Sequence, residues 1–408
     1  MNYQDAIAWL YSTQMFGIKL GLEAPKRLLR DFLAFPKHTT QVIHVAGTNG
    51  KGSTCAMIDS LGRSLALRTG LFTSPHLVDY CERIRVSGCD IPHHRAAQLL
   101  TELRDLIQDW ETHPTFFEIT LALAMRHFRE MECDLIVLET GMGGRLDATT
   151  AVPADICALT PIALDHTKWL GSTLTEIASE KAGIALHGKP LLSSPQEPEA
   201  QIEIERVANQ AQAPLSFITE PLLGYHISLA GAHQRMNAAL ACETIAAAGH
   251  HLSFDVVQHA FSNLRWPGRF EVLETTPFHH SAPLILDAAH NPHAAMTLVQ
   301  TWKEKYGEQK AQVIFGAVED KEVGDVLRII SEVADHFHLV PVNSARGLPP
   351  TSHTDLISGF THNVHNSLPE ALELSSKKAI PTLLTGSLFL LGEAKGLMEQ
   401  RSTRITSQ

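Results

Sequence analysis

The feature that most constrains the fold is an alternation of short apolar runs with amphipathic stretches of helical length. In the first part of the chain, strands are expected at 41–46, 71–73, 134–138 and 155–160, and helices at 53–67, 115–129, 173–182 and 234–248. From residue 283 the alternation restarts, with strands expected at 283–287, 312–315, 336–342 and 382–385, and helices from 293, at 322–333 and after the last strand. This order is typical of α/β domains with parallel sheets.

A glycine-rich loop, Gly47-Thr48-Asn49-Gly50-Lys51-Gly52-Ser53-Thr54, lies between the first expected strand and its helix. Glycines let backbone N–H groups and a helix N-terminus point at an anion, and Lys51 would reach outer phosphates. The spacing differs from the usual Gly-x-x-x-x-Gly-Lys-Ser/Thr motif, and a turn that binds nothing is the alternative. The setting predicts nucleotide binding by Gly47, Thr48, Asn49, Gly50, Lys51, Gly52 and Ser53.

The alternation stops at 266–282, which holds two prolines, a glycine and no sustained period. We therefore expect an α/β protein of two parts within its 408 residues. Residues 1–271 would form a P-loop-type ATPase domain with a mostly parallel central sheet. Residues 272–282 would be a linker, and residues 283–408 a smaller, doubly wound, Rossmann-like domain.

Composition excludes several classes of partner. With 33 Lys+Arg against 44 Asp+Glu, the net charge is −11, which argues against nucleic-acid binding. No run approaches the roughly 20 apolar residues of a membrane span, and the N-terminus lacks a basic segment typical of a signal peptide. The six cysteines are scattered without a Cys-x-x-Cys pair, so we expect a reduced, cytoplasmic protein.

Polar residues follow several expected strands, where the ligand crevice of an open α/β sheet lies. Glu139 follows an apolar strand and could bind magnesium, or could cap the next turn. His166, after Asp165, and Lys181, near a helix end, could each be structural or functional. Asp287 could bind a ribose hydroxyl or cap a helix, and Arg269 could reach across an interdomain cleft or lie on the surface.

Two function classes remain possible on these residues alone. One is an ATP-consuming ligase or kinase with its site between two α/β domains. The other is a guanine-nucleotide switch, which should carry an Asn-Lys-x-Asp motif to read the base. No Asn-Lys dipeptide occurs in the sequence, so the ligase or kinase is favoured.

Taken together, the motifs resemble the folate branch of the Mur ligase superfamily, the folylpolyglutamate and dihydrofolate synthases. The resemblance covers nearly the whole chain, in family order. Its segments are GLE (21–23), HVAGTNGKGS (44–53), FTSPHL (72–77), ERIRVSG (82–88), LETGMGGRLDATT (138–150), LDHTKWLG (164–171), SEKAGI (179–184), HQRMNAALA (233–241), WPGRFEV (266–272) and LDAAHNPHA (286–294).

The resemblance implies a set of site residues. ATP would be bound by the glycine-rich loop together with Asn237, Arg269 and Asp287. Ser74, Glu139 and His166 would bind Mg²⁺, for which two sites are expected. Lys51, His166 and Lys181 would be catalytic, and Lys181 matches a lysine that is carbamylated in the family. The pteroate pocket would be lined by Gly21, Leu22, Glu23, Thr115, Phe116, Phe117, Glu118, Leu146, Asp147 and Ala148.

The implied reaction joins L-glutamate to dihydropteroate and extends reduced folates by γ-linked glutamates, through an acyl phosphate made with ATP. Residues 19–29 and 116–118 resemble the pterin-binding parts of bifunctional members. A folylpolyglutamate synthase alone is the alternative. A Mur-type cell-wall ligase is a more remote alternative. Gly52 replaces the Thr that is usual in that branch, and the roughly 40 residues before the loop leave no room for its usual N-terminal domain. The family habit is a monomer without nucleic-acid or membrane partners. Arg346 and His290 are candidates for binding glutamate by charge and position only.

Overall fold

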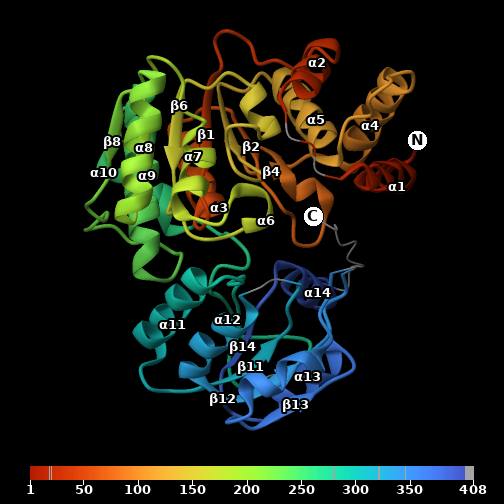
Figure 1. The fold of residues 1–408 in the computed structure, drawn as a ribbon, viewed down its shortest axis with the longest axis vertical. Coiled ribbons are helices and arrows are strands. Elements are labelled where there is room, and N and C mark those ends of the chain that lie inside the picture. The colour runs from red at the N-terminus through yellow and green to blue at the C-terminus, as the bar shows by residue number, and fades with distance from the viewer. Residues whose placement is uncertain (18, 20, 279–280, 320–321, 345, 400–408) are drawn as a thin grey trace.

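The computed structural model describes residues 1–17, 19, 21–278, 281–319, 322–344 and 346–399. These residues form two α/β units that lie one beyond the other along the longest axis of the molecule (Figure 1). Each unit is built on its own sheet, one of eight strands and one of six.

The larger sheet has the strand order β4-β3-β2-β5-β1-β6-β7-β8 and is parallel except for the β2-β3-β4 edge. Its strands are β1 (Gln41–Ala46), β2 (Thr69–Phe72), β3 (Ile84–Val86), β4 (Cys89–Asp90), β5 (Leu135–Glu139), β6 (Ile156–Leu159), β7 (Leu191–Ser193) and β8 (Leu215–Phe217). Because β1 lies between β5 and β6, the carboxyl ends of these three strands meet at one edge. This edge is where open α/β sheets bind ligands.

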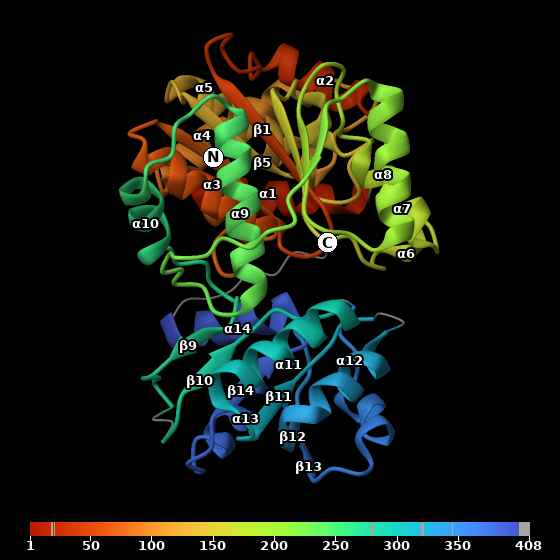
Figure 2. The same cartoon turned by 90° about the vertical axis from the view of Figure 1, so that its left-hand side faces the viewer.

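Helices cover both faces of this sheet (Figure 2). Its helices are α1 (Tyr3–Ser12), α2 (Glu23–Asp31), α3 (Lys51–Ser64), α4 (His93–Ile107), α5 (Phe116–Glu130), α6 (Thr167–Leu170), α7 (Leu174–Ala182), α8 (Pro198–Ala211), α9 (Ala232–Ala247) and α10 (Phe254–Ser262). Alternate side chains of β1 enter different cores. Val42 and Ala46 pack with α2, α5, α7 and α8, whereas Ile43 and Val45 pack with α3, α9 and α10. The period of two in the strand thus gives three layers.

The second sheet has the order β13-β12-β11-β14-β10-β9, parallel except for β9. Its elements are β9 (Glu271–Leu273), β10 (Leu284–Leu286), α11 (Pro292–Tyr306), β11 (Ala311–Phe315), α12 (Val323–Ile330), β12 (Ala334–Leu339), β13 (His362–Val364), α13 (Leu368–Ser375), β14 (Thr382–Thr385) and α14 (Leu388–Glu399). Helices α11 and α12 cover one face, and α13 and α14 the other. The predicted α/β class, with a mostly parallel first sheet and a doubly wound second unit, is confirmed.

One detail of the region between the units differs from the sequence prediction. Residues 271–273, expected at the end of the first domain and in the linker, form β9 and pair with β10 in the second sheet. An edge strand of three residues is too short to show an alternating pattern. Of the predicted linker, residues 279 and 280 lie outside the described residues. We propose a boundary a few residues earlier, near Gly268.

Two of the contacts between the units lie near the carboxyl edge of the first sheet. Asn291 Nδ2, at the start of α11, donates to Asn49 Oδ1 of the glycine-rich loop at 3.1 Å. On α14, a Cβ built on Gly392 would lie 2.2 Å from the carbonyl oxygen of Leu77. Across the described part of the chain, every helix is too short or too polar to cross a bilayer.

Candidate active site

The glycine-rich loop joins β1 to α3, as predicted, and its shape depends on Gly50. Gly50 is the N-cap of α3 with φ +92°, in the left-handed region that favours glycine. A Cβ on Gly50 would also lie 2.9 Å from Asn237 Oδ1 on α9. The loop amides of Thr48 and Asn49 donate to the Pro161 carbonyl, so these residues fix the loop against β6. The first-turn amides of α3 have no partner within the helix and are the groups free to bind an anion.

Three polar side chains around this helix start fit a phosphate. Lys51 Nζ donates to the Gly47 and Thr48 carbonyls of its own loop at 3.2 and 3.1 Å. The hydroxyls of Ser53 and Thr54 are buried without a hydrogen-bond partner in the described structure. Buried hydroxyls are normally paired, so unpaired donors beside a lysine suit a phosphate ligand.

Glu139 is the last residue of β5 rather than the residue after it, and it is buried. Its Oε2 accepts the backbone N–H of Ser74 at 2.9 Å, so these two predicted metal ligands are neighbours. Burial raises the pKa of Glu139, although the positive charge of Lys51 and the Ser74 N–H oppose that rise. Carboxylates and serine hydroxyls are among the oxygen ligands that Mg²⁺ prefers, so this pair of residues fits the predicted metal site.

Asp165 lies between two histidines from different units. Its carboxylate is 3.9 Å from His166 Nε2 and 3.7 Å from His290 Nε2. Burial alone would raise the pKa of Asp165, but the ion pair with His290 holds it well below its usual range. Burial lowers the pKa of His166, which keeps the imidazole neutral and able to bind a metal.

Lys181, near the end of α7, is buried rather than solvated. Its Nζ donates to the Gly47 carbonyl at 2.8 Å, which joins α7 to the glycine-rich loop. Burial, with the nearby charge of Lys51, lowers the pKa of Lys181 to about 7. At neutral pH a large fraction of this amine is therefore uncharged and nucleophilic.

From the second unit, Asp287 and Arg269 reach this edge. Asp287 accepts the backbone N–H groups of Phe270 and Ala289, both at 2.9 Å, while Asn291 is the cap of α11. Of the readings open for Asp287, the helix cap is thus wrong, because Asn291 is nearer the helix start. Burial raises the pKa of Asp287 against the opposing charge of Arg269. The charge of Arg269 also acts on Glu139, so the arginine lies within electrostatic range of both units.

The elements that contain or adjoin the predicted pteroate segments, namely α2, α5 and the short turn Ala148–Ala151, contact one another. Lys19 Nζ donates to the His113 carbonyl at 2.9 Å, which fastens the segment before α2 beside the start of α5. Leu20 of this segment lies outside the described residues. Leu22 precedes α2 as its N-cap.

Several of these residues also have structural roles. Thr115 and Glu118 form the capping box of α5, with Glu118 Oε2 accepting the Thr115 N–H at 2.6 Å. Asp147 is buried and accepts N–H groups of Met142 and Thr149 at 2.9 and 3.0 Å. Phe116 is buried in the core, whereas Phe117 lies against Gly141, where a Cβ would be 2.7 Å from its ring.

Two residues without a role in the sequence prediction, Arg83 and His76, form a buried pair. Arg83 is fully buried, donates from Nε to His76 Nδ1 at 2.7 Å, and has two terminal nitrogens without a partner in the described structure. Both residues lie in quoted motifs, but nothing in their spacing predicts burial.

Of the two glutamate candidates, His290 lies at the interdomain edge beside Asp165, whereas Arg346 is exposed.

Residues 45–193 match the family profile "Mur ligase middle domain", and residues 268–387 match "Mur ligase, glutamate ligase domain". The "Dihydrofolate synthase/folylpolyglutamate synthase" of Bacillus subtilis is 31% identical, over 96% of this chain and 98% of the relative. The chain belongs to this folate branch of the Mur ligase family.

Solved structures agree with this membership. An Escherichia coli FolC structure, in complex with DHPP and ADP, has a TM-score of 0.87 and 28% identity, over 97% of this chain and 98% of its own. A bifunctional folylpolyglutamate synthase/dihydrofolate synthase with Mn, AMPPNP and L-glutamate bound has a TM-score of 0.86 and 28% identity, with the same coverage. The expected ligase family and class of enzyme are therefore confirmed.

Proposed function

We propose that this ATP-dependent ligase has both activities of its branch, joining L-glutamate to dihydropteroate and extending reduced folates with γ-linked glutamates. The observation that carries the proposal is that α2, α5 and the turn Ala148–Ala151, the elements that contain or adjoin the three expected pteroate segments, contact one another. The Lys19 bond to His113 supports a pterin site that includes residues 19–29. A folylpolyglutamate synthase alone is the alternative.

The residues at the carboxyl edge of the first sheet fit a nucleotide and a divalent cation. Gly50, Lys51, Gly52 and Ser53 would hold ATP phosphates, and Asn237, Arg269 and Asp287 the rest of the nucleotide. Ser74, Glu139 and His166 would hold Mg²⁺, whose bound form offsets charge on the phosphoryl group being transferred. Relatives solved with ADP, or with Mn and AMPPNP, support both ligands.

The reaction needs the carboxylate of the folate substrate near the outer phosphate of ATP. The carboxylate oxygen attacks the γ-phosphorus and ADP leaves, which forms an acyl phosphate. The amine of L-glutamate then attacks the acyl carbon, and inorganic phosphate leaves as the amide forms. Lys51 would neutralise charge on the phosphate oxygens, and positioning with electrostatics would supply most of the rate enhancement. The adjoining units would exclude water, which otherwise hydrolyses the acyl phosphate.

Lys181 is proposed to carry a carbamate. A neutral amine can attack CO₂ and release one proton, and the lowered pKa of Lys181 makes the neutral form abundant at pH 7. The product is an anion next to the glycine-rich loop, where it would offset the charges of Lys51 and of a bound cation. A monomer, which is the habit of the family, is part of the proposal.

The test is glutamate-dependent phosphate release from MgATP, run in parallel with dihydropteroate and with tetrahydrofolate. Release with both substrates is expected. Release with tetrahydrofolate alone would leave a folylpolyglutamate synthase, and release with neither would direct the search to Mur-type acceptors. Lys51→Ala serves as the catalytic control and should lower turnover by about 10²–10³-fold without unfolding the protein.

A further inference from the structure

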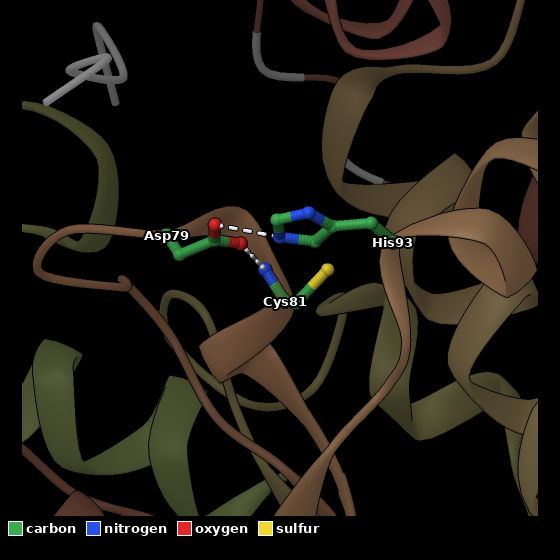
Figure 3. Close-up of side chains that lie close together, drawn as sticks. All are labelled: Asp79, Cys81 and His93. Carbon is green, nitrogen blue, oxygen red and sulfur yellow. Dashed lines mark hydrogen bonds and ion pairs between the residues drawn. The ribbon is translucent and has the colours of Figure 1, made fainter. Parts of the chain in front are cut away.

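Three side chains with metal-binding atoms converge between α1 and α4 of the first unit (Figure 3). Asp79 and Cys81 belong to the short 3₁₀ turn Tyr80–Arg83 and its N-cap, and His93 is the first residue of α4. Their ligand atoms all lie within 4.8 Å of one another. We refer to these residues as the Asp79–Cys81–His93 cluster; none of them belongs to the site proposed above.

The carboxylate of Asp79 is already oriented toward the other two groups. Its Oδ1 accepts the Cys81 N–H at 2.8 Å and the Tyr3 hydroxyl at 3.0 Å. Its Oδ2 faces His93 Nε2 at 2.8 Å. One oxygen is therefore used to fix the carboxylate, and the other is directed at the imidazole.

Tyr3 fixes the remaining two groups. Its ring stacks on the His93 imidazole with centroids 3.9 Å apart and planes 7° apart. Its hydroxyl also lies 3.4 Å from Cys81 Sγ. The tyrosine therefore orients all three groups of the cluster, as residues that contact the ligands rather than the metal do in metal sites. Cys81 is buried whereas the His93 side chain is 57% exposed, which leaves one open side for a cation to enter.

We propose that the Asp79–Cys81–His93 cluster is a binding site for Zn²⁺, with one thiolate, one imidazole and one carboxylate ligand. Zn²⁺ takes sulfur, nitrogen and oxygen ligands in a tetrahedron at about 2.0–2.3 Å, so neighbouring ligand atoms are about 3.3–3.8 Å apart. The widest separation would have to shrink by about 1 Å, and Asp79 Oδ2 and His93 Nε2, which are 2.8 Å apart, would have to move slightly apart. The thiol and imidazole disfavour Mg²⁺ and Ca²⁺, which prefer oxygen ligands.

The site would be structural. It joins the turn at 80–83 to the start of α4 and, through Tyr3, to α1, which lies 76 positions before Asp79 in the sequence. The loop between Ser74 and this turn would be held at its far end by the metal. The cation would therefore stabilise the first unit and take no part in phosphoryl transfer.

The test uses the full chain, stripped with a chelator and returned to buffer containing Mg²⁺. Titration with Co²⁺ should give one equivalent of a tetrahedral cobalt spectrum with a thiolate charge-transfer band, and Zn²⁺ should displace it, since it binds more tightly. Cys81→Ser should remove the charge-transfer band, and His93→Ala should weaken cobalt binding at least tenfold. Tyr3→Phe, which keeps the ring and all three ligands, should weaken it by about 10- to 100-fold.

Two nearby substitutions are matched controls. Cys89→Ser removes an exposed cysteine and His94→Ala an exposed histidine next to His93, and both should bind cobalt as the unmodified protein does. Glu139→Gln should also leave the cobalt spectrum unchanged, which separates this site from the proposed magnesium site. His93→Ala alters an exposed side chain, so it keeps the test valid if Cys81→Ser does not fold. The absence of a thiolate band in the unmodified protein, or its persistence in Cys81→Ser, would overturn the proposal.

Discussion

At the scale of single residues, the glycine-rich loop depends on Gly50, where both the backbone conformation and a neighbouring side chain exclude a Cβ. Gly50 has φ +92°, and a Cβ there would lie 2.9 Å from Asn237 Oδ1. The first condition costs a non-glycine residue about 1–2 kcal/mol. The second would displace Asn237, a proposed nucleotide contact. A glycine with a similar φ but no neighbour would therefore separate the cost of backbone strain from the loss of the Asn237 contact.

We predict that Gly50→Ala lowers the free energy of unfolding by at least about 1 kcal/mol and raises the KM for ATP. Gly249→Ala is the matched control, because Gly249 has φ +87° and nothing within 4 Å of the added Cβ. The control should lose similar stability with an unchanged KM. Urea unfolding and ATP-dependent turnover of both variants make the comparison. Equal KM values in the two variants would count against the Asn237 contact.

The buried amine of Lys181 gives a pH-dependent prediction. With a pKa of about 7, its neutral fraction rises from about a tenth at pH 6 to about nine tenths at pH 8, whereas an ordinary lysine stays charged throughout. In ¹³CO₂-saturated buffer, a carbamate signal should therefore increase over this range in ¹³C NMR. It should vanish in Lys181→Arg and persist in Lys189→Arg, which changes a partly exposed lysine paired with Asp155. A signal that is unchanged in Lys181→Arg would contradict the assignment.

At the scale of elements, the start of α5 combines a helix cap with a proposed substrate contact. Thr115 Oγ1 accepts the Glu118 N–H at 3.3 Å, and Glu118 Oε2 accepts the Thr115 N–H in turn. This capping box satisfies backbone groups that a helix start leaves unpaired. Binding of dihydropteroate at this place would therefore use residues that are already fixed.

We predict that Thr115→Ala destabilises the protein by about 1 kcal/mol and also raises the KM for dihydropteroate. Ser253→Ala removes the cap of α10, where Ser253 Oγ accepts the Val256 N–H, and should cost comparable stability with an unchanged KM. Thr115→Ser should restore both properties. Thermal unfolding with steady-state kinetics distinguishes the effects, and an equal change of KM in Thr115→Ala and Ser253→Ala would exclude a direct role of Thr115.

Elements whose hydrophobic pattern is sustained over many residues could be predicted from the sequence, whereas very short elements could not. The helix expected at 115–129 is observed at Phe116–Glu130, because its apolar face repeats over four turns. The strand at 41–46 was also located correctly, since five successive buried residues follow Gln41. In contrast, β9 has three half-buried residues and gains its order only from pairing with β10. Hydrogen bonds to a distant strand leave no local pattern.

The same limit applies to the site. Glu139 could be located because it ends a buried strand, and Lys51 because a glycine-rich loop joins it to another; both are local signals. The bond between Asn49 and Asn291 joins residues 242 positions apart, and nothing in either segment predicts it. The burial of Arg83 and Lys181 likewise depends on the packing of several elements. Sequence therefore locates the strand ends, and folding determines which side chains become buried there.

At the scale of the whole molecule, the approach of the two units depends on a helix glycine. A Cβ on Gly392 of α14 would lie 2.2 Å from the carbonyl oxygen of Leu77, three residues after Ser74. Leu77 is held in turn by Glu82, whose Oε2 accepts the Leu77 N–H at 2.8 Å. The backbone of one unit therefore lies directly against the helix of the other. An added methyl group must separate them.

We predict that Gly392→Ala lowers kcat for ligation at least tenfold, while α14 itself becomes intrinsically more favourable by up to about 1 kcal/mol. The separated units would expose the acyl phosphate to water, so ATP hydrolysis without amide formation should rise relative to ligation. Gly324→Ala on α12 is the control, because its Cβ would meet only Leu356 at an ordinary 3.6 Å. Small-angle scattering should give a larger radius of gyration for Gly392→Ala and no change for Gly324→Ala. If Gly392→Ala keeps the scattering curve and the coupling of the unmodified protein, the contact with Leu77 has no part in closing the site.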